Sequence, residues 1–318
     1  MAGLFQVFFW LSRDNLVTLN ENSFEKIESL SYSPFEGYDK NLLSSEQIAY
    51  DVNLFENFTN KLRTYGTLEA YKILQSSKDS NLPIDLGLWI GGDLEANNLE
   101  IQRALEILKE YPNRIQSVIV GNEVLLRKEL EPLELYAYID FMKSHTKKPV
   151  TTAETWDIWE KNPQLASHVD FLTIHILPYW EKVPIERYNE FIIEKYSVVE
   201  ELFPNRKIVI GETGWPSHGY NNNKAVPSIK NQAQAIRGFV NLAHEKGWHY
   251  NIIEALDQPW KGYDEGNVGQ YWGIFTTDRA LKFQLAGEVE LNKYWLYQMI
   301  AAIIIGALLT LFGLRNQR

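Results

Sequence analysis

The chain of 318 residues is predicted to form an α/β fold, a (β/α)8 TIM barrel followed by a C-terminal transmembrane helix. Short apolar runs alternate eight times with helical patterns, and one long uncharged stretch lies near the C-terminus. Strands of an all-parallel sheet are buried on both faces, so they read as apolar runs, and they need crossover helices. The eight units fill residues 22–290, a length typical of such a barrel. A doubly wound open sheet is the alternative, but eight units favour closure and no Gly-x-Gly-x-x-Gly motif follows the first strand.

Each unit is identified from its own residues. Apolar runs predict strands over residues 26–32, 60–66, 83–91, 115–123, 149–154, 169–176, 206–212 and 250–257. Apolar residues at helical spacing predict helices over 44–58, 67–77, 95–110, 131–145, 187–203 and 228–246, with a short helix after residue 154. The first of these helices begins at a serine, a residue that favours helix N-termini.

The two ends of the chain differ from the middle. Residues 294–314 carry no charge, and a bilayer-spanning helix needs about 20 such residues. The basic tail, residues 315–318, then indicates a cytoplasmic C-terminus, with the barrel outside the cytoplasm in the periplasm or at the cell surface. Residues 1–21 form a separate hydrophobic segment, a short or truncated signal anchor, and whether it crosses the membrane stays open.

The amino-acid composition argues against several classes of function. A formal charge of −10 without a basic cluster argues against a nucleic-acid partner. The six histidines show no His-Glu-x-x-His spacing, so no metal is predicted, and no motif suggests a cofactor. The absence of cysteine excludes disulfides and thiol catalysis.

Chemistry in such barrels lies at the carboxyl ends of the strands, and here nearly every strand ends in a carboxylate, an aromatic ring or both. Aromatic faces stack on the apolar face of a sugar ring, and charged or amide groups bind its hydroxyls, so this rim suggests a sugar site. The candidate site residues are Tyr32, Arg63, Tyr65, Asn122, Glu123, Glu154, Trp156, His175, Tyr179, Glu212, Trp215, Glu254, Asp257 and Lys261.

Two glutamates stand out among them. Glu123 in "VIVGNE" and Glu212 in "IVIGE" each follow a buried strand and a glycine. Cleavage of a glycosidic bond uses two carboxyl groups, one to protonate the leaving oxygen and one to attack or to activate water. Asn122 is placed to bind the sugar 2-hydroxyl. These residues alone do not decide which glutamate has which role, but the charge of Glu212 is expected to keep Glu123 protonated in the free protein.

The motifs "VGNE" and "GETGWPS", together with "SYSPF", "LRTYG", "TIHILPYW", "EALDQPWKG" and "YWGIFTTDRALK", resemble glycoside hydrolase family 17 over roughly residues 28–285. The resemblance is to membrane-anchored bacterial-type members. It implies that Glu212 is the nucleophile and Glu123 the acid/base of a retaining endo-β-1,3-glucanase. Where many relatives have Asp-Glu-Pro-Trp, this chain has Gln258 in place of the glutamate.

Two alternatives stay open. The same barrel chemistry serves a β-1,3-glucanosyltransferase that remodels, branches or cyclises glucan beside a separate glucan synthase. The second alternative, from another class of function, is an inactive glucan-binding membrane module. This hypothesis predicts that one of the two glutamates has been replaced, but the sequence contains both.

Overall fold

The computed structural model describes residue 9 and residues 16–19, 24, 26–292 and 294–315. Eight parallel strands form a closed barrel in which each strand pairs with the next in the chain and the last pairs with the first. They are β2 (Leu30–Ser31), β5 (Leu62–Arg63), β6 (Ile84–Leu88), β7 (Ile115–Asn122), β8 (Val150–Thr155), β9 (Leu172–His175), β10 (Ile208–Thr213) and β11 (His249–Ile252). The predicted (β/α)8 barrel is therefore confirmed.

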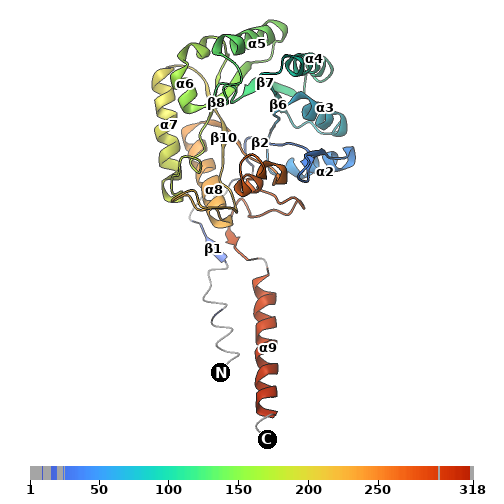
Figure 1. Cartoon of the computed structure of the whole chain (residues 1–318), viewed down its shortest axis with the longest axis vertical. Helices are drawn as coiled ribbons and strands as arrows, with labels where there is room; N and C mark the ends of the chain where they lie inside the picture. Colours follow the sequence, from blue (N-terminus) through green and yellow to red (C-terminus); the bar gives the residue numbers. More distant parts are fainter. Residues whose placement is uncertain (1–8, 10–15, 20–23, 25, 293, 316–318) are drawn as a thin grey trace.

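Helices surround this barrel as a ring in Figure 1. They are α2 (Ser45–Phe55), α3 (Thr67–Ser76), α4 (Leu94–Glu110), α5 (Pro132–His145), α6 (Trp156–Lys161), α7 (Tyr188–Leu202) and α8 (Ile229–Lys246). Side chains of Ser44, Asp93 and Ser228 cap the first backbone N–H groups of α2, α4 and α8, which explains where these helices begin. The 3-10 helices η1 (Pro163–Ser167) and η2 (Ile185–Arg187) follow α6 and precede α7.

The eighth unit departs from the pattern. Strand β11 ends at Ile252 rather than at the predicted residue 257, and every residue from there to 288 is described. The helical turns in this segment are the 3-10 helices η3 (Pro259–Gly262) and η4 (Asn267–Tyr271). Gly266 between them has φ 69°, a left-handed conformation that breaks a helix. The segment 253–287 is thus an irregular cover at the mouth of the barrel.

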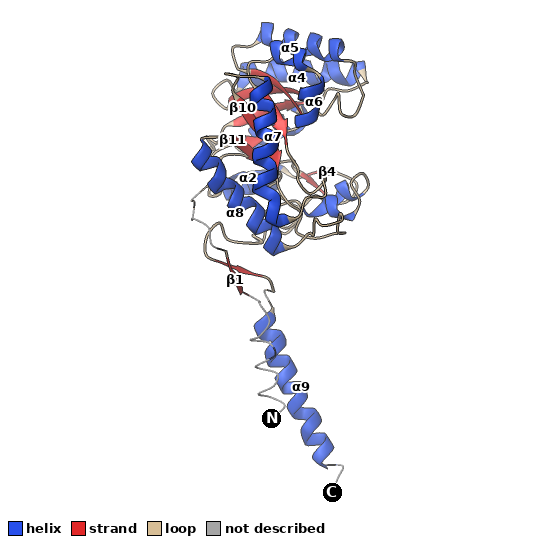
Figure 2. Cartoon of the chain, turned by 90° about the vertical axis from the view of Figure 1, so that its left-hand side faces the viewer, coloured by secondary structure: helices blue, strands red, loops and turns tan. Residues whose placement is uncertain are grey.

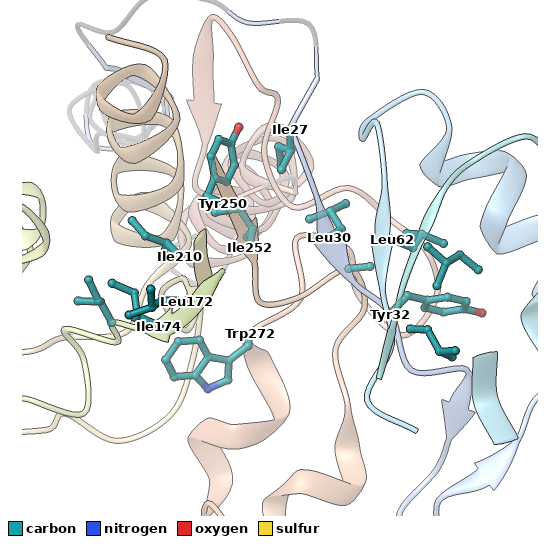
Figure 3. Close-up of a cluster of buried hydrophobic side chains, with 14 of the residues drawn as sticks. Ile27, Leu30, Tyr32, Leu62, Leu172, Ile174, Ile210, Tyr250, Ile252 and Trp272 are labelled. Atoms are coloured by element: carbon teal, nitrogen blue, oxygen red, sulfur yellow. The ribbon is translucent and has the colours of Figure 1, made fainter. Parts of the chain in front are cut away.

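Apolar side chains on the outer faces of the strands pack beneath the surrounding helices, because the alternate residues Ser31, Arg63, Thr173 and Asn251 face the interior of the barrel. Leu30, Leu62, Leu172, Ile174 and Ile210 have no exposed surface, and Figure 3 shows them gathered with Ile252 and Tyr250. Each such side chain contributes roughly 1.5–3 kcal/mol when it is fully buried. This packing fixes the strand ends on which the rim residues sit.

Two small antiparallel pairs lie outside the barrel. β3 (Phe35–Glu36) and β4 (Asn41–Leu42) form a hairpin directly after β2. β1 (Leu16–Thr18) pairs with β12 (Glu288–Glu290), with Leu16 opposite Glu290. Because the pairing is antiparallel, the chain before β1 and the chain after β12 leave this ribbon at the same end.

Helix α9 (Trp295–Arg315) lies apart from the barrel in Figures 1 and 2. Its window Trp295–Phe312 is long and apolar enough to cross a bilayer, and none of that window is buried. By length and composition it is a candidate membrane span. The predicted N-terminal segment, residues 1–21, lies almost entirely outside the described residues.

Candidate active site

The two glutamates come from strands three positions apart around the barrel. Glu212 lies inside β10 and is 5% exposed, whereas Glu123 directly follows Asn122 at the end of β7. Glu123 has φ 54°, a left-handed conformation that side-chain-bearing residues rarely adopt. Its backbone N–H donates to the carbonyl of Ala153 at 2.7 Å, which holds this conformation in place. Strained backbone of this kind gathers at functional sites.

His175, at the end of β9, lies between the two carboxylates. Its Nδ1 is 2.7 Å from Oε1 of Glu123, and its Nε2 is 3.6 Å from Oε1 of Glu212. One ligand-type atom from each of the three side chains lies within 4.8 Å of the others. The structure therefore brings the two predicted carboxylates together at one place on the rim.

Arg63, at the end of β5, connects the same groups from below and is 2% exposed. Its Nη2 donates to Oδ1 of Asn122 at 2.6 Å and its Nη1 to the carbonyl of Gly211 at 2.5 Å. Nη1 also lies 3.4 Å from Oε1 of Glu212 and 3.3 Å from Nε2 of His175.

The arginine fixes the tautomer of the histidine. A guanidinium has donors only, so Nε2 of His175 must accept from Arg63. The proton of the neutral ring is then on Nδ1, and Nδ1 donates to Glu123. Glu123 is therefore the acceptor in this hydrogen bond, as expected of a carboxylate.

Close packing at Gly211 makes this network possible. A Cβ at this position would collide with Cγ2 of Thr173 and lie 3.1 Å from the ring of His175 and 3.2 Å from Nη1 of Arg63. The sequence "IVIGE" thus needs its glycine so that the arginine and histidine can approach the strand that carries Glu212.

The ionisation of Glu123 differs from the expectation. Burial raises its pKa, but the hydrogen bond from His175 and the charges of Arg127 and Arg63 outweigh burial, so its pKa lies below the usual value. The expectation that the charge of Glu212 keeps Glu123 protonated in the free protein is therefore wrong. It overlooked cationic and donor groups that come from distant strands.

A cavity of about 610 Å³ opens above the two glutamates. Four predicted site residues line it: Glu123, Trp156, His175 and Glu212. The remaining lining residues were not predicted as site residues. They are Leu126, Thr155, Leu177, Trp180, Glu181, Tyr220, Ile253, Asp264, Glu265, Gly266 and Trp272.

One wall of this cavity is aromatic. The rings of Trp180 and Trp272 are stacked, with centroids 5.9 Å apart and planes at 25°. The indole N–H of Trp272 is buried and has no partner among the described residues, so a donor is available beside the cavity. Trp272 follows η4, far from any strand end, which is why the pattern of strand ends did not indicate it.

Three predicted aromatic residues lie behind the rim. Tyr32 donates to Oδ2 of Asp51 on α2 at 2.9 Å, and Tyr179 donates to the carbonyl of Tyr220 at 2.6 Å. The indole of Trp215 donates to the carbonyl of Val226 at 3.1 Å. Tyr32, Tyr179 and Trp215 are at most 1% exposed, so they support the site and are not on its surface.

Two predicted carboxylates also have internal partners. Glu154 accepts from the backbone N–H groups of Leu125 and Leu126, at 2.8 and 3.3 Å, and so holds the turn that follows Glu123. Burial raises the pKa of Glu154 to about 7. Asp257 binds Nζ of Lys282 at 2.6 Å and is 7% exposed.

The remaining predicted residues lie within the irregular segment and just after β5. Lys261 binds both oxygens of Glu254, at 2.8 and 2.9 Å, and both side chains are buried. Burial raises the pKa of Glu254 to about 7 despite this partner. Tyr65 donates to the hydroxyl of Ser31 at 3.0 Å, and the guanidinium of Arg63 lies 5.0 Å from its ring centroid.

Glu123, His175 and Glu212 carry atoms of the types that bind metal ions, close enough together to hold one. Arg63 already places a cation at this position, 3.4 Å from Glu212 and 3.3 Å from His175. An ion there would meet the repulsion of a buried guanidinium, so a metal-free site stays our prediction.

The chain is similar in sequence to known glycoside hydrolases. The sequence profile of the BtgE/BtgC glycoside hydrolase domain matches residues 29–273. The chain is 27% identical over 255 residues to a glucan 1,3-beta-glucosidase of Schizosaccharomyces pombe, covering 74% of this chain and 79% of that protein. It is 29% identical over 276 residues to a putative glucan endo-1,3-beta-glucosidase (btgC) of Aspergillus niger, covering 75% of this chain and 40% of that protein.

A solved structure has the same fold. The glycoside hydrolase family 17 β-1,3-glucanosyltransferase of Rhizomucor miehei superposes with a TM-score of 0.74 at 24% identity, over 82% of this chain and 98% of that one. An active-site mutant of that enzyme was solved in complex with laminaritriose, with the same TM-score. The family match spans the whole barrel, including both glutamates: this chain belongs to the BtgE/BtgC glycoside hydrolase domain family, within glycoside hydrolase family 17.

Proposed function

We propose that the chain is a retaining β-1,3-glucan-active glycosidase in which Glu212 is the nucleophile and Glu123 the acid/base. The observation that carries the proposal is the approach of the two carboxylates to within 4.8 Å. Retaining enzymes hold their carboxyl groups about 5–5.5 Å apart, whereas inverting enzymes need about 6.5–9.5 Å to admit a water molecule. The cavity above the pair is where the scissile bond would lie.

The surroundings of the two glutamates support these roles. Glu212 is buried, and its Oε1 lies 3.4 Å from Nη1 of Arg63, which fixes the carboxylate beside the cavity as a nucleophile requires. Attack by Glu212 on the anomeric carbon forms a glycosyl ester, and the leaving oxygen takes a proton from Glu123. Glu123 is more exposed to the cavity and must first take up a proton in the substrate complex. Substrate that displaces water strengthens burial, the largest influence that raises the pKa of Glu123.

Asn122 is our proposed partner of the sugar 2-hydroxyl. Its Oδ1 accepts from Arg63 at 2.6 Å, which orients the amide NH2 away from that bond and leaves it free to donate. A hydrogen bond to the 2-hydroxyl strengthens as charge develops on the sugar ring.

The substrate class is inferred from the family and from the cavity. Relatives of this chain are named as glucan 1,3-beta-glucosidases and as glucan endo-1,3-beta-glucosidases. Carboxylates line the cavity together with the rings of Trp156, Trp180 and Trp272, a lining that suits a neutral sugar and repels an acidic one. We infer that the substrate is a β-1,3-glucan or a gluco-oligosaccharide.

Transfer to a second sugar is the alternative outcome, and the aromatic wall favours it. The rings of Trp156, Trp180 and Tyr220, with Leu177, line the cavity that contains Glu123. An acceptor sugar stacked there would exclude the water that otherwise releases the intermediate. The enzyme would then remodel glucan, beside a separate glucan synthase as its proposed partner. An inactive glucan-binding module is disfavoured because both glutamates, Asn122 and Arg63 form one connected network.

We further propose that α9 anchors the protein in a membrane. Its apolar window is unburied, and two arginines follow within the last four residues of the sequence. In this arrangement the barrel lies outside the cytoplasm and the C-terminus inside.

The test uses the full chain in detergent with β-1,3-gluco-oligosaccharides of defined length, and products are resolved by mass over time. Shorter products alone indicate hydrolysis, and longer or branched products indicate transfer. Proton NMR of the first product gives its anomeric configuration, which must be β for retention. An initial α product would refute the covalent mechanism.

The nucleophile is tested by Glu212→Ala on a nitrophenyl β-glycoside. We expect turnover to fall by at least about 10⁴-fold, with partial recovery in azide and an α-configured glycosyl azide as product. The matched control is Glu181→Ala, which removes an exposed carboxylate from the same cavity and should leave most activity. Normal turnover in Glu212→Ala would discard the assignment.

A further inference from the structure

An exposed aromatic patch lies on the rim next to the cavity, outside the residues discussed so far. We define the rim patch as Phe35 and Tyr38 from the β3–β4 hairpin, with Trp260 and Tyr263 from η3 and the residue after it. Tyr38 is 57% exposed and Tyr263 is 74% exposed. Exposed aromatic rings that adjoin one another form a contiguous apolar patch, the kind of surface that marks ligand-binding grooves.

The four rings contact each other across the two segments. The centroids of Phe35 and Trp260 are 6.4 Å apart, and those of Tyr38 and Tyr263 are 6.1 Å apart, both pairs in edge-to-face arrangement. The hydroxyl of Tyr38 also lies 3.4 Å from Oε1 of Gln270. The hairpin is therefore held against the irregular segment by these rings.

One ring of the patch is rigidly placed by Gln258. The indole N–H of Trp260 donates to Oε1 of Gln258 at 2.6 Å, and Nε2 of Gln258 donates to the carbonyl of Ser33 at 2.9 Å. A glutamate could accept from the indole, but its ionised form has no proton for the carbonyl. Gln258, which stands where many relatives have a glutamate, thus joins Trp260 to the base of the hairpin.

The patch is continuous with the cavity through one short stretch of chain. Trp260 and Tyr263 belong to the patch, and the next three residues, Asp264–Gly266, line the cavity with both glutamates. Between them, Lys261 is anchored on Glu254. A polymer that leaves the cavity over this stretch meets the rings of the patch next.

We propose that the rim patch is a distal binding site for the β-1,3-glucan chain whose nearer sugars fill the cavity. The inference rests on the proposed function and deepens it, because it predicts a preference for long substrates. Exposed tyrosines offer apolar faces to sugar rings and hydroxyls to their edges. The ammonium of Lys40, 4.3 Å from the centroid of the Trp260 ring, supplies donors for sugar hydroxyls at the same place.

The experiment measures dissociation constants by calorimetry on the full chain carrying Glu212→Gln, which keeps the shape of the site without its nucleophile. The ligands are β-1,3-gluco-oligosaccharides of two to eight units. We expect affinity to rise in two steps with length. The double variant Tyr38→Ala/Tyr263→Ala should lose the second step, binding the longest ligand about tenfold more weakly and the shortest ligands unchanged.

Tyr50→Ala is the matched control, because Tyr50 on α2 has the same 57% exposure as Tyr38. It should change no dissociation constant. Unchanged binding of the longest ligand by the double variant would overturn the proposal and leave the proposed function intact. Equal loss at every length would also overturn it, since the rings would then act on the cavity itself. Failure of any oligosaccharide to bind the Glu212→Gln chain would refute the proposed function as well.

Discussion

His175 connects the two candidate catalytic glutamates, with Nδ1 2.7 Å from Glu123 and Nε2 3.6 Å from Glu212. Because Arg63 forces Nε2 to accept, the histidine donates to Glu123 and lowers the pKa of that carboxyl. An acid/base glutamate loses its proton as pH rises through its pKa. The histidine therefore sets the upper pH limit of the enzyme in the proposed mechanism.

We predict that His175→Phe moves the alkaline limb of the pH profile of kcat/KM to higher pH. The variant removes the donor that lowers the pKa of Glu123, while burial, which raises it, remains. The measurement is initial rate on a nitrophenyl β-glycoside across pH, with His218→Phe as the control histidine. An alkaline limb at the wild-type pH would show that His175 does not control this proton.

Arg63 is predicted to be necessary for both stability and turnover. Arg63→Met leaves Glu212 buried without its cation, which costs about 3–5 kcal/mol in comparable pairs. We expect the free energy of unfolding in urea to fall by this amount and kcat to fall at least about 100-fold.

The variant Arg63→Lys tests whether the hydrogen bonds of the guanidinium are needed in addition to its positive charge. A single ammonium cannot reach Asn122, the Gly211 carbonyl and Glu212 together, so kcat should stay low while part of the stability returns. The control is Arg187→Met, which breaks exposed ion pairs with Glu190 and Glu194 and should cost less than about 1 kcal/mol. Full activity in Arg63→Lys would contradict the connected network.

Glu69 is predicted to make stability depend on pH. Burial raises its pKa to about 7 in the folded protein, so the folded state holds a proton that the unfolded state releases near pH 4.5. Wild-type stability therefore falls as pH rises from about 4.5 to about 7 through this group. Glu69→Gln keeps an oxygen for the backbone N–H groups of Tyr65 and Gly66 but cannot ionise.

Urea unfolding at several pH values measures this effect. We expect Glu69→Gln to gain stability relative to wild type as pH rises, by about 3 kcal/mol at most between pH 4.5 and 8. The exposed Glu106 on α4 provides the control, Glu106→Gln. A constant difference between Glu69→Gln and wild type across this range would mean that Glu69 is charged in the folded protein.

The proposed membrane topology can be tested with single cysteines, because the chain has none of its own. Lys78→Cys lies on the exposed surface of the barrel and Asn316→Cys follows α9. A membrane-impermeant maleimide added to intact spheroplasts should label the first and not the second. Both should react after the membrane is opened, and the reverse pattern would invert the proposed orientation.

The fold could be predicted because each strand of a parallel barrel is buried on both sides. Runs such as residues 208–211 and 118–121 are apolar throughout, and helical spacing between the strands marks the crossovers. The course of the irregular segment 253–287 could not be predicted from the periodicity of its apolar residues. Its course depends on Gly266 in the left-handed region and on contacts with the β3–β4 hairpin.

The site was predictable where a residue ends a strand and faces inward. Glu123, His175 and Glu212 met this condition, and the structure brings them together. Tyr32 lies only one residue beyond β2, but its side chain points to Asp51 on α2, since neighbouring residues of a strand face opposite ways. Trp272 was not predicted because it lies in the irregular segment. In that segment no pattern in the sequence indicates which residues come close to the site in the folded chain.

The short β1–β12 ribbon lies between the barrel and helix α9 in Figures 1 and 2. In the proposed membrane arrangement this ribbon becomes the spacer that sets the height above the lipid at which the polysaccharide is worked on.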